Sequence, residues 1–152
     1  MGVTPDEVGR LILPSAEYLC SAIRGHHVAA HRVTRIAAGL GRLYQRGSSA
    51  RAPRCCCGRG ELVLAIDTWV AEHLPVPHPD ARLHTETVGA VIDRLARTQV
   101  YAYRLLMTVD NVADPQVHAA WYRLAELVDG YTDLNTSLSQ RSLRLPALGD
   151  GA

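Results

Sequence analysis

The 152-residue sequence contains no lysine and no phenylalanine, so all 16 of its basic side chains are arginines, as a GC-rich bacterial genome would favour. It also lacks any run of about 18 apolar residues, which excludes a transmembrane helix. Asp6 and Glu7 lie where a secretory signal peptide would carry positive charge, so a signal peptide is not expected. Hydrophobic residues make up 47% and charged residues 20%, which is typical of a globular protein. We therefore expect a single cytoplasmic domain over residues 1–146 and a flexible tail over 147–152.

Acidic residues are absent from a long part of the first half. Between Tyr18 and Gly60 there are eight arginines and no aspartate or glutamate, whereas residues after Gly60 include seven arginines and twelve acids. A charge asymmetry of this kind points to an acidic partner, a membrane surface or nucleic acid.

Period-two alternation is not evident, and the apolar residues recur at helical spacing. Thr4-Pro5 starts a short helix that Pro14 ends, Thr85 or Thr87 can cap a later helix, and Asp114-Pro115 starts the last one. The segment after Arg141 contains proline and glycine and is expected to fray. The pattern predicts an all-α, antiparallel bundle of about four long helices, over residues 16–46, 61–74, 85–108 and from 114 onward.

The first long segment has one apolar side and one basic side when its residues are placed at about 100° intervals. It is expected to form one long helix, broken at most at Gly25, Gly39 or Gly41. A solvent-exposed helix face is the default interpretation of this basic side. Like charges one turn apart repel, however, and no carboxylate relieves them, which favours a nearby acidic partner. The residues of this Arg/His stripe are Arg24, His27, His31, Arg32, Arg35, Arg42 and Arg46.

Three partners fit such a stripe: an acidic protein, a phosphate-bearing ligand, or the exposed Glu126, Asp129 and Asp133 of a second copy of this chain in a homodimer. Nucleic acid is possible but not favoured, because no helix-turn-helix or other reading motif is present. No membrane partner is expected. The first hypothesis is therefore a helical accessory or interaction protein.

Three adjacent cysteines, Cys55, Cys56 and Cys57, lie in a segment with several arginines, and Cys20 is the only other cysteine. Structural zinc sites usually separate paired cysteines by two to four residues, so metal binding is not favoured here. The neighbouring arginines would lower the pKa of these thiols and make them redox-sensitive. His27 and His31 are one helical turn apart but lack a third ligand, and no cofactor is implied.

Glu86, Asp93, Arg97 and Arg104 share one side of the third long segment. Asp93 and Arg97 have the ordinary spacing of a helical ion pair, which is the favoured interpretation. Glu86 and Asp93 are nevertheless the catalytic candidates of an alternative hypothesis. In it, the chain is a small cofactor-free enzyme or small-molecule-binding protein of bacterial specialised metabolism, with a pocket near these carboxylates and the Trp69/Trp121 pair.

The segment His84-Thr85-Glu86-Thr87-Val88-Gly89-Ala90-Val91-Ile92-Asp93-Arg94-Leu95-Ala96 resembles a motif of uncharacterised helical proteins from actinobacterial genomes. The stretches 65–70 and 121–127 are similar in style, so the resemblance covers about residues 60–146. It implies a helical fold and a bacterial setting but no reaction. It singles out Glu86, Gly89, Asp93 and Arg94, and an ion pair of Arg94 with Asp67 is one expectation.

Overall fold

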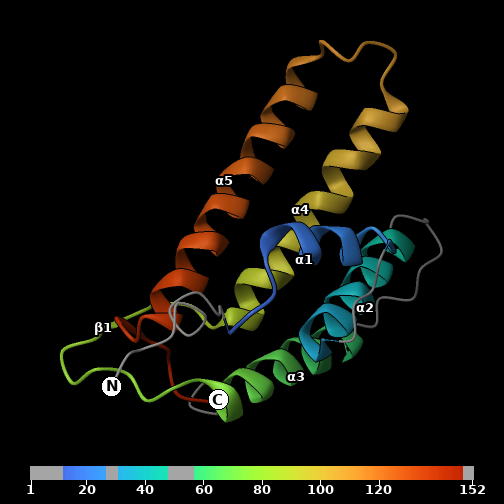
Figure 1. Cartoon of the computed structure of the whole chain (residues 1–152). Coiled ribbons are helices and arrows are strands. Elements are labelled where there is room, and N and C mark those ends of the chain that lie inside the picture. Colours follow the sequence, from blue (N-terminus) through green and yellow to red (C-terminus); the bar gives the residue numbers. More distant parts are fainter. Residues whose placement is uncertain (1–11, 27–30, 48–56, 149–152) are drawn as a thin grey trace.

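The computed structural model describes residues 12–26, 31–47 and 57–148 of the chain. Five helices lie in these residues (Figure 1). The prediction of an all-α fold is confirmed, because the only strands found in them are two residues long, β1 (Arg82–Leu83) and β2 (Leu143–Arg144). The helices are α1 (Ala16–Ile23), α2 (Arg32–Arg46), α3 (Cys57–His73), α4 (Val88–Thr108) and α5 (Pro115–Ser139).

The expected single helix over residues 16–46 is wrong, and its division into α1 and α2 gives five helices where about four were expected. Gly25 ends α1 with a positive φ of 86°. The backbone N–H of Gly25 donates to the carbonyl of Ala22, and that of His26 to the carbonyl of Ser21. This is the Schellman arrangement, in which a glycine in the left-handed region closes a helix and turns the chain away. Residues on the two sides of Gly25 therefore do not share one helical face.

The starts of α4 and α5 follow local sequence signals. The Thr87 hydroxyl accepts a hydrogen bond from the Ala90 N–H at 3.2 Å, and the Asp114 carboxylate accepts one from the Gln116 N–H at 2.8 Å. Pro115 then occupies the first turn of α5, where its missing N–H costs nothing. Both helix starts agree with the expectation.

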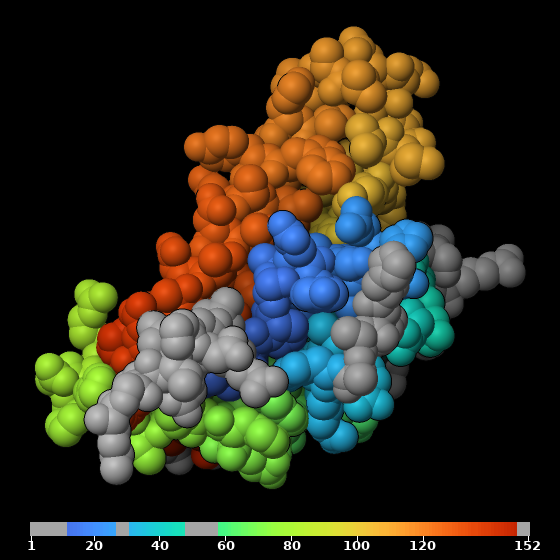
Figure 2. All heavy atoms as spheres, viewed as in Figure 1, coloured from blue at the N-terminus to red at the C-terminus, as the bar shows by residue number. Residues whose placement is uncertain are grey.

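Helix α4 contacts all four other helices and forms an antiparallel hairpin with α5. The far end of this hairpin stands clear of α1, α2 and α3 (Figures 1 and 2). No helix in the described ranges is both long and apolar enough to cross a membrane.

The core lies where α1, α2 and α3 pack around α4, which together with α1 also packs against α5. Its fully buried large side chains include Leu19, Ile23, Leu40, Ile66, Val70, Ile92, Leu95, Tyr131 and Leu138. Helices α1 and α2 approach so closely that a Cβ on Gly41 would lie 2.2 Å from the Ile23 carbonyl oxygen. A glycine at this position is required by packing, not by a turn.

Two polar side chains of α5 attach the segment before α1 to the core. Asn135 is 1% exposed, and its amide both accepts from the Leu13 N–H at 3.2 Å and donates to the Leu13 carbonyl at 3.0 Å. The Tyr131 hydroxyl donates to the Pro14 carbonyl at 2.6 Å. These bonds satisfy backbone groups that would otherwise be buried without partners.

The chain after α5 was expected to fray, but its described residues form a turn and a short strand. Arg141, with φ 63°, occupies the left-handed position of a second Schellman turn, and Ser142 N–H donates to the Ser137 carbonyl. This turn directs β2 into parallel pairing with β1, with Arg82 opposite Leu143. The chain is therefore ordered by pairing through Arg144; of the predicted 147–152 tail, residues 149–152 lie outside the described residues.

Candidate functional site

The residues of the predicted Arg/His stripe are distributed over separate elements. Arg24 caps the end of α1, and its guanidinium lies over the Tyr103 ring, 5.4 Å from the centroid, and donates to the Tyr103 hydroxyl. His31 begins α2, where its Nδ1 accepts from the Val33 N–H at 3.1 Å. The His31 ring also contacts Trp69, and burial lowers the pKa of His31. His27 lies outside the described residues.

The remaining stripe residues, Arg32, Arg35, Arg42 and Arg46, are exposed on α2. Glu61 of α3 lines the same surface hollows as Arg32, Arg42 and Arg46, yet these three arginines form no ion pair with a described residue. The structure therefore keeps a basic α2 face but separates it from Arg24.

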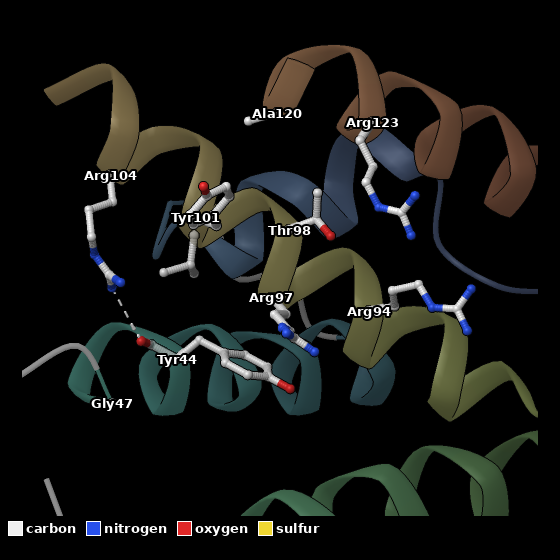
Figure 3. A pocket seen from close by; sticks show the side chains of 10 residues that line it. Tyr44, Gly47, Arg94, Arg97, Thr98, Tyr101, Arg104, Ala120 and Arg123 are labelled. Carbon is white, nitrogen blue, oxygen red and sulfur yellow. Dashed lines mark hydrogen bonds between the residues drawn. The ribbon is translucent and has the colours of Figure 1, made fainter. Parts of the chain in front are cut away.

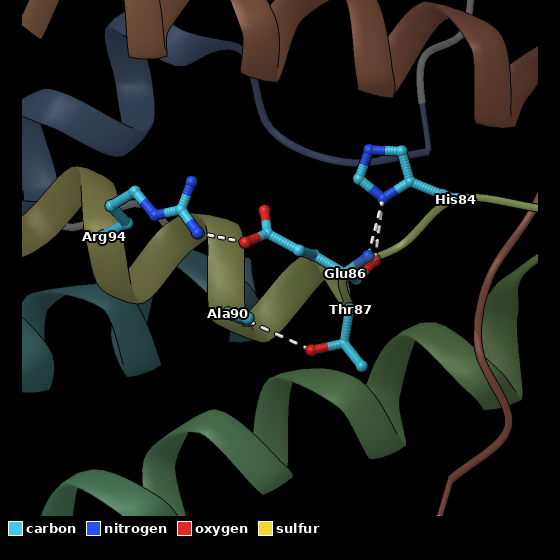
Figure 4. Close-up of polar contacts among 5 residues, drawn as sticks. All are labelled: His84, Glu86, Thr87, Ala90 and Arg94. Atoms are coloured by element: carbon cyan, nitrogen blue, oxygen red, sulfur yellow. Dashed lines mark hydrogen bonds and ion pairs between the residues drawn. The ribbon is translucent and has the colours of Figure 1, made fainter. Parts of the chain in front are cut away.

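The segment over residues 84–96, singled out from the sequence, leads into α4 and forms its first turns (Figure 4). Glu86, just before the N-cap Thr87, pairs with Arg94 of the second turn of α4. The Nδ1 atom of His84 contacts both the carbonyl and the N–H of Glu86, at 2.8 and 3.2 Å. The expected ion pair between Arg94 and Asp67 is wrong, because Arg94 pairs with Glu86 and Asp67 accepts from the Gly89 N–H.

Asp67 instead binds the backbone at the start of α4. Its Oδ1 accepts from the Gly89 N–H at 2.7 Å, and a Cβ on Gly89 would lie 2.6 Å from that same oxygen. Burial raises the pKa of Asp67, while the Gly89 N–H and the Thr87 hydroxyl partly offset that effect. Gly89 is thus required for the close approach of α3 and α4.

Asp93 is buried, with 9% of its surface exposed, and bridges α2, α3 and α4. Its Oδ1 accepts from the Tyr44 hydroxyl at 2.7 Å, and its Oδ2 lies 3.2 Å from Arg59 Nε. The expected pair with Arg97 is therefore wrong, because Arg59 of the neighbouring helix is the ion-pair partner. The catalytic role of Asp93 stays a prediction. Its observed hydrogen bond holds the Tyr44 hydroxyl in place.

Tyr44 supplies a pH-dependent prediction. Burial, together with the hydrogen bond from Tyr44 to Asp93 and the Asp93 charge, raises the pKa of Tyr44 to about 12. Since the folded-state pKa is above the unfolded value of about 10, this group's contribution to stability is complete below pH 10 and is lost as the pH rises toward 12. In a titration of tyrosinate absorbance we expect a step near pH 12 that Tyr44→Phe removes.

Asp93→Asn should move that step toward pH 10, because it removes the adjacent negative charge. Tyr131, whose pKa burial also raises, should be unaffected by both substitutions. An unchanged step in Asp93→Asn would contradict the assigned contact.

The most distinctive surface feature is a cleft of about 580 Å³ between the end of α2, the middle of α4 and α5. Four arginines line it and define what we call the arginine cleft: Arg94, Arg97, Arg104 and Arg123. From α5, Arg123 extends toward α4 on the side where Arg94 and Arg97 leave that helix (Figure 3). Thr98, Tyr44 and Tyr101 also line the cleft, beside apolar Val100 and Ala120.

The charge in this cleft is not balanced by carboxylates. No aspartate or glutamate is among its lining residues, and of its four arginines only Arg94 forms an ion pair within the described part of the chain. Arg104 donates to the Tyr44 carbonyl at 3.4 Å, and Arg97 and Arg123 are exposed. Glu86 and Asp93, the predicted catalytic residues, do not line the cleft.

Three of these arginines, Arg94, Arg97 and Arg104, are among the residues of interest predicted from the sequence, but the cleft is not predicted. Arg94, Arg97, Tyr101 and Arg104 follow one another at spacings of three or four, which places them along one face of a helix. A helical face with these four residues could therefore be predicted from the sequence. The contributions of Arg123, Thr98 and Tyr44 could not, because they depend on how α2 and α5 pack against α4.

The predicted pocket near the Trp69/Trp121 pair is not formed as expected. Trp69 stacks on His73 with ring centroids 4.2 Å apart, whereas Trp121 packs edge-on against Tyr103 at 4.9 Å. These tryptophans lie on α3 and α5, which make no contact with each other.

The cysteines remain separate from these features. Cys55 and Cys56 lie outside the described residues, and Cys57 begins α3. Cys20 is half-buried in α1, and burial raises the pKa of its thiol. Across residues 12–26, 31–47 and 57–148, no group of three histidine, cysteine or acidic side chains is placed to hold a metal ion.

A comparison with protein-family models matches residues 57–145 to the family described as "Protein of unknown function (DUF4254)". The chain belongs to this family. The DUF4254 match covers the region from α3 to β2, in agreement with the expected resemblance over residues 60–146. No curated protein and no solved structure gives a significant match.

All four arginines of the cleft lie within the DUF4254 range, whereas α1 and α2 precede it. The family description states no activity, so the function has to be argued from the site.

Proposed function

We propose that this DUF4254 protein binds a phosphate-bearing small molecule in the arginine cleft. The observation that carries the proposal is that four arginines line one cavity whose lining has no carboxylate. A phosphate-bearing ligand was among the partners expected from the sequence, but the residues that support it here are Arg97, Arg104 and Arg123 in place of the α2 stripe.

Phosphate fits the donors of this cleft better than a single carboxylate does. Guanidinium groups offer paired N–H donors in a planar fork, which matches two oxygens of one phosphate group. The Thr98 and Tyr101 hydroxyls line the same space and can donate to further oxygens. A doubly charged group would also relieve the repulsion between the unpaired arginines.

The size of the cleft favours a small ligand over nucleic acid or an extended peptide. Its volume of about 580 Å³ falls in the usual range for small-molecule sites. Val100 is 9% and Ala120 7% exposed, so the cleft has an apolar floor beneath the charged groups. Such a floor lowers the local dielectric and strengthens charge-assisted hydrogen bonds.

Charge reversal tests the proposal. Pyrophosphate added to the protein in low-salt, phosphate-free buffer should bind, and NMR titration should place the largest chemical-shift changes on α4 between Arg94 and Arg104. The Arg97→Glu/Arg104→Glu variant should bind pyrophosphate at least about 100-fold more weakly, because it removes two charge-assisted contacts and adds two repulsive charges.

The matched control is Arg42→Glu/Arg46→Glu, which changes the net charge equally but alters the exposed α2 face outside the cleft. It should bind pyrophosphate nearly as the wild type does. If only this control loses binding, the ligand contacts the α2 face instead and the cleft proposal fails. Sedimentation of the same variant at low salt reports on the alternative of a homodimer through Glu126, Asp129 and Asp133, which are exposed on α5.

A further inference from the structure

A second cavity, of about 320 Å³, adjoins the arginine cleft. Val100 and Arg104 line both spaces, so Arg104 borders the cleft on one side and the second cavity on the other. A ligand held by Arg104 could therefore extend from one into the other.

The chemistry of the second cavity is different from that of the cleft. Ile23 and Met107 contribute apolar surface, and Gln99 contributes an uncharged amide. Its other arginine, Arg24, is already engaged by the ring and the hydroxyl of Tyr103. This space is thus suited to an uncharged organic group, not to a second phosphate.

Gln99 supplies the specific feature. It is 2% exposed, and its Nε2 donates to the Cys20 carbonyl at 2.9 Å, which sets the orientation of the amide. Its Oε1 is buried and accepts no hydrogen bond from a described residue. Buried acceptors are almost always satisfied in folded proteins, so an unsatisfied acceptor on a residue that lines a cavity favours a ligand that brings a donor.

We infer that the ligand of the arginine cleft is a phosphate ester whose uncharged organic part occupies the second cavity and presents an O–H or N–H donor to Gln99. The inference rests on the proposed function, because the phosphate group is placed in the cleft. The volume accommodates on the order of ten non-hydrogen atoms. Arg104 and Met107, the latter 82% exposed, are long side chains that can rotate to admit such a group.

Two matched series of probes test this inference: ω-hydroxyalkyl phosphates with two to six carbons, and n-alkyl phosphates with the same number of non-hydrogen atoms. Inorganic phosphate is the reference in each titration. We expect n-alkyl phosphates to bind more tightly than inorganic phosphate, and one length of hydroxyalkyl phosphate to bind about tenfold more tightly than its alkyl match.

Two variants test the contribution of the Gln99 acceptor and that of the cavity volume separately. Gln99→Met should abolish the preference for the hydroxyl while leaving inorganic phosphate binding unchanged. Met107→Trp, at an exposed position that tolerates substitution, should narrow the cavity and remove the advantage of organic phosphates over inorganic phosphate. Unchanged inorganic phosphate binding in both variants shows that each is folded.

The outcomes distinguish this inference from the proposed function. If inorganic phosphate binds in the cleft but no organic phosphate binds more tightly, or if Gln99→Met keeps the preference for the hydroxyl, the inference is overturned and the proposed function stands. If neither inorganic nor organic phosphates bind, the proposed function fails and the inference fails with it.

Discussion

Gly41→Ala is expected to lower the free energy of unfolding by at least about 3 kcal/mol, because overpacking at a backbone-to-backbone crossing leaves no side chain that can move aside. The new Cβ would lie 2.2 Å from the Ile23 carbonyl oxygen, so α1 and α2 would have to separate. Leu19 and Leu40, both fully buried, would lose packing as the helices moved apart. Urea unfolding followed by circular dichroism measures the change.

Gly130→Ala is the matched control for that substitution. Gly130 lies within α5, and a Cβ there would meet no atom within 4 Å. Alanine at an open helical position should raise the free energy of unfolding by about 1 kcal/mol. If both alanine variants are equally stable, the close contact of α1 with α2 is not present in solution.

Asn135→Ala is expected to cost about 3 kcal/mol of unfolding free energy, because it leaves both the N–H and the carbonyl of Leu13 buried without partners. Leu13 is 3% exposed, and the described structure assigns both of these backbone groups to the Asn135 amide. Hydrogen exchange at the Leu13 amide should accelerate more than exchange elsewhere in the core, since the segment before α1 would open locally.

Two further substitutions on α5 should lower the free energy of unfolding by smaller amounts. Tyr131→Phe removes a single hydrogen bond, to the Pro14 carbonyl, and should cost about 1 kcal/mol. Thr132→Ala alters an exposed neighbour whose hydroxyl bonds only within the helix, and should change stability by less than about 0.5 kcal/mol. A cost for Asn135→Ala no larger than that for Thr132→Ala would contradict the attachment of this segment to α5.

Local signals were sufficient for the helix class and for several helix ends. Thr87 and Asp114-Pro115 begin α4 and α5 as expected, because a capping side chain needs only the backbone of its own first turn. The sequence did not decide at which glycine the first basic segment breaks. Gly25, Gly39 and Gly41 were equivalent in sequence, but Gly25 ends a helix whereas Gly41 permits a close crossing, and that distinction depends on the packing of α1 against α2.

Neither ion pair expected from the sequence, Asp93 with Arg97 or Arg94 with Asp67, is formed, because the partners depend on which helices pack together. Spacing placed Arg97 beside Asp93, yet Arg59 from α3 and Tyr44 from α2 reach the carboxylate first. Asn135 gave no sequence signal at all, since its partner is a backbone 122 residues away.

The sequence by itself determined that this chain is helical and that its basic residues are all arginine. It determined these because composition, periodicity and capping act over a few residues. The anionic ligand or partner that the sequence suggests stays a prediction. Only the tertiary structure decided where the unpaired arginines gather. The arginine cleft is lined by Tyr44 from α2, by Arg94, Arg97 and Arg104 from α4, and by Arg123 from α5. No spacing along one helix can specify a cavity whose walls come from three.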